Sequence, residues 1–172
     1  MAQRSAGIWS TLGPGRKRTI AVLLVTLMLT LLFIWGNSLL DREQSKQTSD
    51  YVEVYVRPVL HAVLRPFKTP QAIDSIDIRK LAHFAEFFVL GIQFVWLRFL
   101  LWPIRRFSVL FPVLLSLMAA GIDEALQFIN RRGPSLTDVG IDWLGALSGM
   151  FIFWVISALV LRLRRGKEAN NA

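Results

Sequence analysis

Residues 19–40 read TIAVLLVTLMLTLLFIWGNSLL, and no charged residue occurs from Ile20 to Leu40. An α-helix needs about 20 consecutive apolar residues to cross the hydrocarbon core of a bilayer. The apolar run is longer than the roughly 7–15 residues of a secretory signal, and no small-residue cleavage site follows it. The segment is therefore predicted to be a membrane span that is retained in the mature protein.

Three further blocks of similar length and character follow, at residues 81–102, 107–129 and 139–161. Helices are expected in all four, because a helix satisfies its own backbone hydrogen bonds in lipid. Charged residues make up only 19% of the 172-residue chain, against about 25% in a typical soluble domain. Cysteine is absent, which excludes disulfides, cysteine-ligated zinc and iron–sulfur clusters. We predict an all-α polytopic membrane protein, with a four-transmembrane-helix bundle as its one domain at residues 19–161.

Lysine and arginine are concentrated in residues 1–18, in the connection between the second and third blocks, and in residues 162–172. In a four-span protein these segments lie on one side of the membrane, and the positive-inside rule makes that side cytoplasmic. Residues 41–80 are also rich in basic residues, but that segment is long and acids nearly balance them. We therefore expect a cytoplasmic N-terminal segment at residues 1–18 and a basic cytoplasmic tail at residues 162–172. The net charge of +8 does not indicate nucleic-acid binding, because no soluble basic domain carries it.

The long connection between the first two spans has two parts. Residues 41–50 are polar and are expected to form a loop. Residues 51–67, YVEVYVRPVLHAVLRPF, carry apolar side chains at helical spacing, with Pro58 as an interruption. The pattern predicts an amphipathic helix in the outer membrane–water interface, either as a lid over the spans or as a packing element alone. At the end of the chain, residues 166–172 are expected to be disordered.

Polar and ionisable side chains interrupt the last three spans. Because successive spans run in opposite directions, these side chains fall near the outer end of each. They are His83, Glu86, Asp123, Glu124, Gln127, Asp138 and Asp142. An ionisable group inside a span costs roughly 2.5–3.5 kcal/mol on insertion scales, so such groups usually face the interior and serve a function. Gly145 and Gly149 form a small-xxx-small pair, which is predicted to bring the fourth span close to a neighbouring helix.

Three stretches carry distinctive motifs: IRKLAHFAEFFVLG at residues 78–91, DEALQF at 123–128 and RRGPSLTDVGIDWLGALSG at 131–149. Together they resemble the VanZ-like family of bacterial membrane proteins, whose pattern is roughly R-K-x-x-H-x-x-E-Y, then D-E-x-x-Q, then an arginine six residues before D-V-x-x-D/N-x-x-G-x-x-x-G. The six-residue step to Asp138 favours Arg132 over Arg131 as the matching arginine. Carried over by position, the family residues are Lys80, His83, Glu86, Asp123, Glu124, Gln127, Arg132, Asp138, Asp142 and Gly145.

The first functional hypothesis is the binding of an anionic lipid or a lipid-linked cell-wall precursor. The ligand-binding set is Lys80, Gln127, Arg131, Arg132, Asp138 and Asp142. Its arginines offer bidentate forks for phosphate and its lysine a point charge. The resemblance implies a multi-pass protein of the bacterial cytoplasmic membrane, with a role in the cell envelope and in susceptibility to teicoplanin. Both termini are expected in the cytoplasm and the polar site outside.

The second hypothesis is an intramembrane enzyme that acts on a lipid phosphate or a glycan linkage. Its candidate catalytic residues are His83, Glu86, Asp123 and Glu124. The imidazole would act as general acid or base, oriented by the glutamate one turn later. A divalent cation is the cofactor considered, with oxygen ligands from Asp123, Glu124, Asp138 and Asp142, and zinc also fits if the histidine takes part.

Two further interpretations stay open. The acids and bases near the outer ends of the spans nearly neutralise one another, which also fits a structural ion-pair network in a protein that works with an envelope partner protein. Transport would require a homo-oligomer, because four short spans enclose little volume, and the glycine pair could serve such a dimer.

Overall fold

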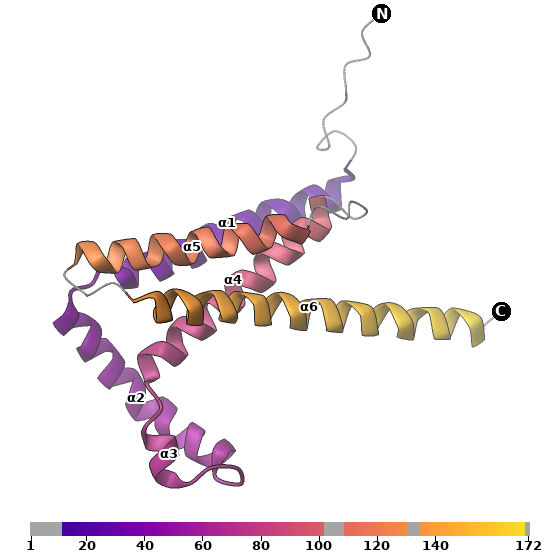
Figure 1. Ribbon diagram of the computed structural model, residues 1–172. Helices are drawn as coiled ribbons and strands as arrows, with labels where there is room; N and C mark the ends of the chain where they lie inside the picture. Colours follow the sequence, from indigo (N-terminus) through magenta and orange to yellow (C-terminus); the bar gives the residue numbers. More distant parts are fainter. Residues whose placement is uncertain (1–11, 102–108, 131–134, 171–172) are drawn as a thin grey trace, which may run out of the picture.

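The computed structural model describes residues 12–101, 109–130 and 135–170, and all regular structure within them is helical (Figure 1). The helices are α1 (Pro14–Ser38), α2 (Arg42–Leu64), α3 (Pro70–Asp74), α4 (Ile78–Leu101), α5 (Leu110–Ile129) and α6 (Leu136–Asn170). Four of them, α1, α4, α5 and α6, are long and apolar enough to cross a membrane. The structure thus confirms the prediction of an all-α polytopic membrane protein.

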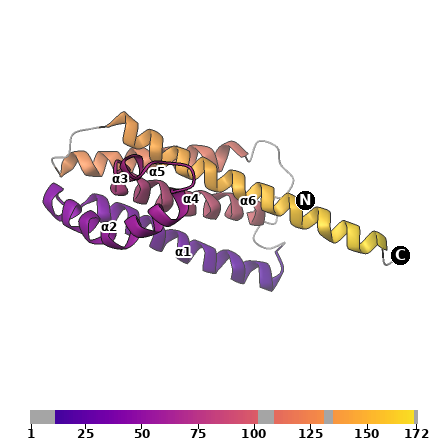
Figure 2. The same ribbon diagram turned by 90° about the horizontal axis from the view of Figure 1, so that it is seen from below.

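The helix α4 contacts each of the other three spans, and it packs most closely against α6 (Figure 2). Glycine brings these two backbones together. A Cβ added at Gly91 would lie 2.1 Å from the carbonyl oxygen of Ala146, and one at Gly149 would lie 2.1 Å from that of Phe88. Small residues permit such an approach between helices in a membrane. The absence of a side chain at Gly91 and Gly149 therefore allows the close spacing of α4 and α6.

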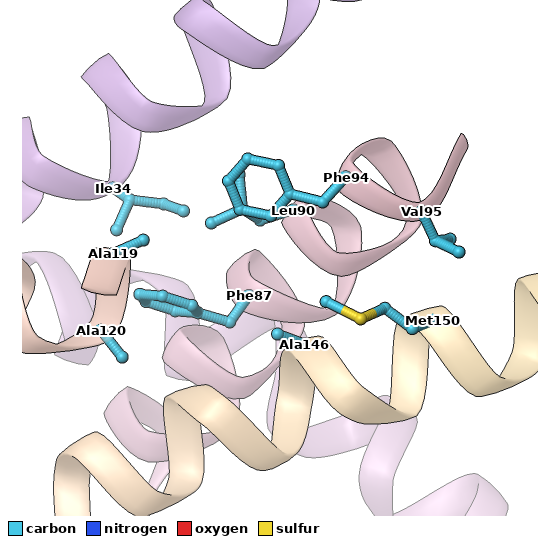
Figure 3. Close-up of a cluster of buried hydrophobic side chains, with 9 residues drawn as sticks. All are labelled: Ile34, Phe87, Leu90, Phe94, Val95, Ala119, Ala120, Ala146 and Met150. Carbon is cyan, nitrogen blue, oxygen red and sulfur yellow. The ribbon is translucent and has the colours of Figure 1, made fainter. Parts of the chain in front are cut away.

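The centre of the bundle is filled by apolar side chains from all four spans. Figure 3 shows them: Ile34, Phe87, Leu90, Phe94, Val95, Ala119, Ala120, Ala146 and Met150. Large apolar side chains also cover the outside of the spans, where Val25, Phe33 and Phe151 are each more than half exposed. Lipid tails are as apolar as these side chains, so an apolar outer surface is the expected exterior of a helix bundle in a bilayer.

The two ends of the bundle differ in character. At one end α1 begins and α6 ends (Figure 1). There the Arg16 guanidinium donates through Nε to the carbonyl oxygen of Leu100 at 2.9 Å and through Nη2 to that of Phe99 at 3.3 Å. These bonds satisfy carbonyls that the end of α4 would otherwise leave without an intrahelical partner. The opposite end, where α1 and α5 end and α4 and α6 begin, holds the polar residues.

The connection between α1 and α4 is more helical than expected. The prediction of a loop at residues 41–50 is wrong, because α2 begins at Arg42 and continues through Pro58. A capping box explains the early start. Asp41 Oδ1 accepts a hydrogen bond from the Gln44 N–H at 2.8 Å, and Gln44 Oε1 accepts one from the Asp41 N–H at 3.3 Å. The helix predicted for residues 51–67 is therefore the second part of a longer one.

The short helix α3 lies beside α2 and was not predicted (Figure 1). Arg57 joins the two helices. Its Nη1 atom donates to the carbonyl oxygens of Ile73 at 2.8 Å and Ile76 at 3.1 Å, and its guanidinium also forms an ion pair with Glu53 one turn earlier. One side chain thus satisfies a carbonyl in the last turn of α3 and another in the segment that follows the helix.

The end of the chain is also more ordered than expected. The helix α6 continues to Asn170, so the prediction of disorder is wrong for residues 166–170, and residues 171–172 lie outside the described part of the chain. The extension contains Arg162, Arg164 and Arg165, which are good helix formers. A single Gly166 does not end the helix, since glycine in a helix interior costs only about 1 kcal/mol relative to alanine.

Candidate functional site

Polar side chains from all four spans meet at one end of the bundle. The buried ones are Ser38 at the end of α1, Asp123 and Gln127 in α5, and Asp142 near the start of α6. His83, in the second turn of α4, joins them. Successive spans alternate in direction, so the last turns of α1 and α5 come level with the first turns of α4 and α6. This connectivity explains how residues far apart in sequence share one depth.

Asp123 lies at the centre of this cluster and is fully buried. Ser38 Oγ donates to its Oδ1 at 2.5 Å, and Gln127 Nε2 donates to its Oδ2 at 2.7 Å. Gln127 is one turn further along α5, as its spacing of four residues predicts. Both carboxylate oxygens therefore have a donor, and the carboxylate is held in one orientation.

His83 lies between two carboxylates. Its Nδ1 is 3.7 Å from Asp123 Oδ2 and 3.8 Å from Asp142 Oδ1. These distances are longer than a hydrogen bond, but the ligand atoms of the three residues all lie within 4.8 Å of one another. Asp142 Oδ1 is buried and has no hydrogen-bond partner among the described residues.

Gly145 holds this geometry in place. A Cβ at Gly145 would lie 2.4 Å from the carbonyl oxygen of Phe84. Phe84 follows His83 in α4, and Gly145 is one turn after Asp142 in α6. The backbone contact between α4 and α6 is thus directly beside the pair of side chains, so it fixes their separation.

Asp138 and Glu124 lie at the edge of the cluster and have other partners. Arg79 Nη2 is 3.4 Å from Asp138 Oδ2, and Lys80 Nζ is 3.6 Å from Asp138 Oδ1. Glu124 Oε1 accepts a hydrogen bond from the backbone N–H of Ser135 at 2.5 Å. Glu124 therefore ties α5 to the first turn of α6, where it also offers a negative charge to the helix N-terminus.

Glu86 contacts α1. Its Oε1 accepts a hydrogen bond from Asn37 Nδ2 at 3.2 Å, whereas its buried Oε2 has no hydrogen-bond partner in the described part of the chain. Asn37, Ser38 and Arg79 were not among the predicted site residues. The sequence contains a signal for Asn37 and Ser38, because both are polar residues near the outer end of the first span, at the depth of the other polar groups. Arg79 directly precedes Lys80 in the first motif.

The two predicted phosphate-binding arginines, Arg131 and Arg132, lie outside the described residues. Of the remaining predicted residues, the structure groups His83, Asp123 and Asp142 with their ligand atoms within 4.8 Å of one another, and Gln127 is hydrogen-bonded to Asp123. It places Lys80 at the edge of the cluster, beside Asp138.

A groove leads to the cluster between α1, α2 and α4. Its section nearer the cluster, called the polar section because it holds the groove's charged and amide side chains, has a volume of about 340 Å³. Asn37, Ser45, Arg79, His83 and Glu86 line it together with the apolar Phe33, Leu40, Val52, Ile78 and Ala82. An adjoining section of about 580 Å³ runs along α1 and α4 and is lined by Leu29, Thr30, Phe33, Ala85, Glu86 and Val89. Phe33 and Glu86 line both sections, so the two sections adjoin at these side chains.

Two further cavities complete the surroundings. A polar cavity of about 550 Å³ lies between α2, α3 and the start of α4, and it shares Arg79, Ser45 and Ser49 with the groove. A cavity of about 10 Å³, which is the size of one water molecule or ion, borders His83, Asp138 and Asp142. Arg79 lines this cavity as well.

These features define a polytopic helical membrane protein with a cluster of buried carboxylates at one end of its spans. The sequence pattern of the VanZ/LLP1 family matches residues 20–157, which is most of the chain. The chain therefore belongs to the VanZ/LLP1 family, as the three motifs indicated. Comparisons with curated proteins and with solved structures give no match.

Proposed function

We propose that this protein binds a lipid with an anionic headgroup, of the kind that carries cell-wall precursors, in the groove between α1, α2 and α4. One observation carries the proposal, namely the change of chemistry along the groove. Its section near the cluster combines polar and charged side chains, among them Arg79 and Glu86, with apolar ones, whereas the lining of the adjoining section is mainly apolar. An amphiphile is the class of ligand that matches both.

Arg79 is the residue that suits an anionic headgroup. It lines the polar section of the groove and both neighbouring cavities. Its guanidinium has five N–H donors. Within the described part of the chain, one side-chain hydrogen bond is formed by this group, from Nη2 to Asp138. The remaining donors suit a phosphate, which arginine binds in a bidentate manner. Asn37 and Ser45 add uncharged polar groups to the same section.

The apolar section suits a hydrocarbon chain. It extends along α1 from the level of Phe33 to that of Leu29, and Ala85 and Val89 of α4 form its other wall. At 1.5 Å per helical residue, Leu29 lies about 12 Å deeper along the span than Asn37. A chain in this section would run toward the middle of the bilayer, while its headgroup stays at the polar end.

The position of α2 is compatible with the outer interface. Tyr51, Val54, Tyr55, Val59 and Val63 of α2 are all more than half exposed, and the helix also carries charged residues. Such a helix is stable at the headgroup level, where its apolar side chains reach the acyl boundary. With the basic segments at the other end of the spans placed in the cytoplasm, the groove opens to the outer leaflet.

Co-purification tests the proposal. The full chain is isolated in mild detergent, and retained lipid is identified by native mass spectrometry. About one phosphate-containing lipid per chain is expected. Arg79→Gln should weaken lipid binding by roughly 10- to 150-fold and so lower the occupancy, because a hydrogen bond to a charged group contributes about 1.5–3 kcal/mol. Ala85→Phe should lower it by filling the apolar section.

Ala21→Phe is the matched control, since Ala21 is exposed on α1 and does not line the groove. Equal lipid occupancy in the wild type and all three variants would refute the proposal. If the lipid carries an envelope precursor, cells that lack the protein should also differ in their sensitivity to a teicoplanin-type glycopeptide, and Arg79→Gln should not restore it.

A further inference from the structure

Two buried carboxylates and one imidazole converge where α4, α5 and α6 meet. Asp123 and Asp142 are 0% and 2% exposed, and His83 Nδ1 lies 3.7 and 3.8 Å from their nearest oxygens. We infer that His83, Asp123 and Asp142 hold one divalent cation of the first transition row, such as Zn²⁺ or Mn²⁺. The inference does not depend on the lipid proposal.

The spacing of the ligand atoms suits a metal ion. Zinc binds imidazole nitrogen and carboxylate oxygen at about 2.0–2.2 Å, which places neighbouring ligand atoms of a tetrahedron about 3.4 Å apart. The two distances from His83 Nδ1 exceed this by only a few tenths of an ångström. Small side-chain rotations would close the difference. The same distances are too long for direct hydrogen bonds, and the three ligand atoms all lie within 4.8 Å of one another, which leaves space for one ion between them.

The charge of the cluster requires a positive partner. A buried carboxylate is costly unless it is paired. Among the described residues, Arg79 and Lys80 border the cluster and are both directed to Asp138, and His83 pairs with Asp123 and Asp142 as a cation only when it is protonated. Asp142 Oδ1 has no hydrogen-bond partner among the described residues, although less than a tenth of its side chain is exposed. A cation between the carboxylates supplies the missing partner.

The surroundings of the cluster support the same conclusion. The cavity of about 10 Å³ beside His83 and Asp142 has room for one water molecule, which is the ligand that an incomplete protein coordination shell needs. Asp123 is held by Ser38 and Gln127, and hydrogen bonds of this kind orient a ligating carboxylate. One nitrogen and two oxygens favour zinc or manganese over magnesium and calcium, which prefer oxygen ligands alone.

The ligand set is narrower than the sequence suggested. Glu124 and Asp138, two of the four carboxylates considered for a cation, are bound to the Ser135 N–H and to the pair of basic residues. His83 takes their place. The three proposed ligands come from three different spans, so the cation would also join α4, α5 and α6.

Metal analysis of the full chain in detergent tests the inference. The protein is stripped with a chelator, incubated with Zn²⁺ or Mn²⁺, desalted and measured by plasma mass spectrometry. About one equivalent per chain is expected for the wild type, with a rise in thermal stability on loading. Asp142→Asn and His83→Gln should each weaken binding by at least 100-fold.

His61→Gln is the control, because His61 is the chain's other histidine and pairs with Asp74 outside the spans. It should bind metal like the wild type. Cobalt provides a second measurement on the wild type alone, since a bound Co²⁺ ion with nitrogen and oxygen ligands gives visible absorption bands. Absence of a retained equivalent and of these bands would overturn the inference and leave a proton as the partner of Asp142. Equal metal content in the wild type and Asp142→Asn would overturn it as well.

Discussion

Replacing Gly149 with alanine is expected to destabilise the bundle, because the added methyl group meets backbone rather than a side chain. The new Cβ would lie 2.1 Å from the Phe88 carbonyl oxygen and 3.0 Å from its carbon. An ordinary contact begins at 3.4 Å, so α4 and α6 would have to separate by roughly 1.3 Å at this point. Neither partner can rotate away, since both belong to helix backbone.

The size of the effect follows from this separation. A gap of 0.5–1 Å already loses about a quarter to a half of the dispersion energy between the atoms that line it. Overpacking of a tightly packed interior usually costs about 1–3 kcal/mol. We expect Gly149→Ala to fall in the upper half of that range, because α4 and α6 form the closest packing in the described structure.

Reversible unfolding in mixed micelles, with increasing SDS and detection by circular dichroism, measures the difference. Gly121→Ala in α5 is the matched control, since nothing lies within 4 Å of a Cβ at that position. Alanine at position 121 should be neutral or stabilising by up to about 1 kcal/mol, because alanine is more favourable than glycine inside a helix. If Gly149→Ala is as stable as Gly121→Ala, the backbone contact between α4 and α6 described above does not exist.

Two further predictions concern the regions outside the bundle. Arg57→Met should remove the hydrogen bonds to the end of α3 and accelerate amide exchange there, while the spans keep their protection; unchanged exchange in α3 would contradict this role. In intact cells, Gln47→Cys should react with a membrane-impermeant maleimide and Lys167→Cys should react only after permeabilisation. The reverse pattern would place the groove and the polar cluster on the cytoplasmic side.

The four spans could be predicted because their signal is simple. An apolar run of about 20 residues indicates a membrane helix whatever its neighbours are. Two predictions were wrong because polar segments were expected to be non-helical, namely residues 41–50 and 166–170. Asp41 and Gln44 have the spacing of a capping box, which starts α2 despite the polar residues that follow. The basic residues after the last span continue α6, because charge does not prevent a helix from leaving the membrane.

Part of the composition of the polar cluster could be predicted, but Ser38 was missed, and the pairings could not be predicted. Spacing alone places His83, Asp123 and Asp142 at one depth. Which of them meet depends on how each helix is rotated, and the α4–α6 contact determines that for two of the three. Glu124 turns to the Ser135 N–H because the first turn of α6 lies beside it. No periodicity in the sequence contains that information.

The cluster has one fixed side and one open side, and this difference sets the path by which the proposed lipid would enter. Backbone contact at Gly145 fixes α6 against α4, so Asp142 and His83 have little freedom to move apart. On the other side, α1 and α2 border the groove, and Glu86 is linked to α1 through Asn37. A lipid that approaches along the apolar section would reach the polar end beside Glu86 without separating α4 from α6. Binding of the proposed lipid would therefore leave the α4–α6 contact, and with it the positions of His83 and Asp142, unchanged.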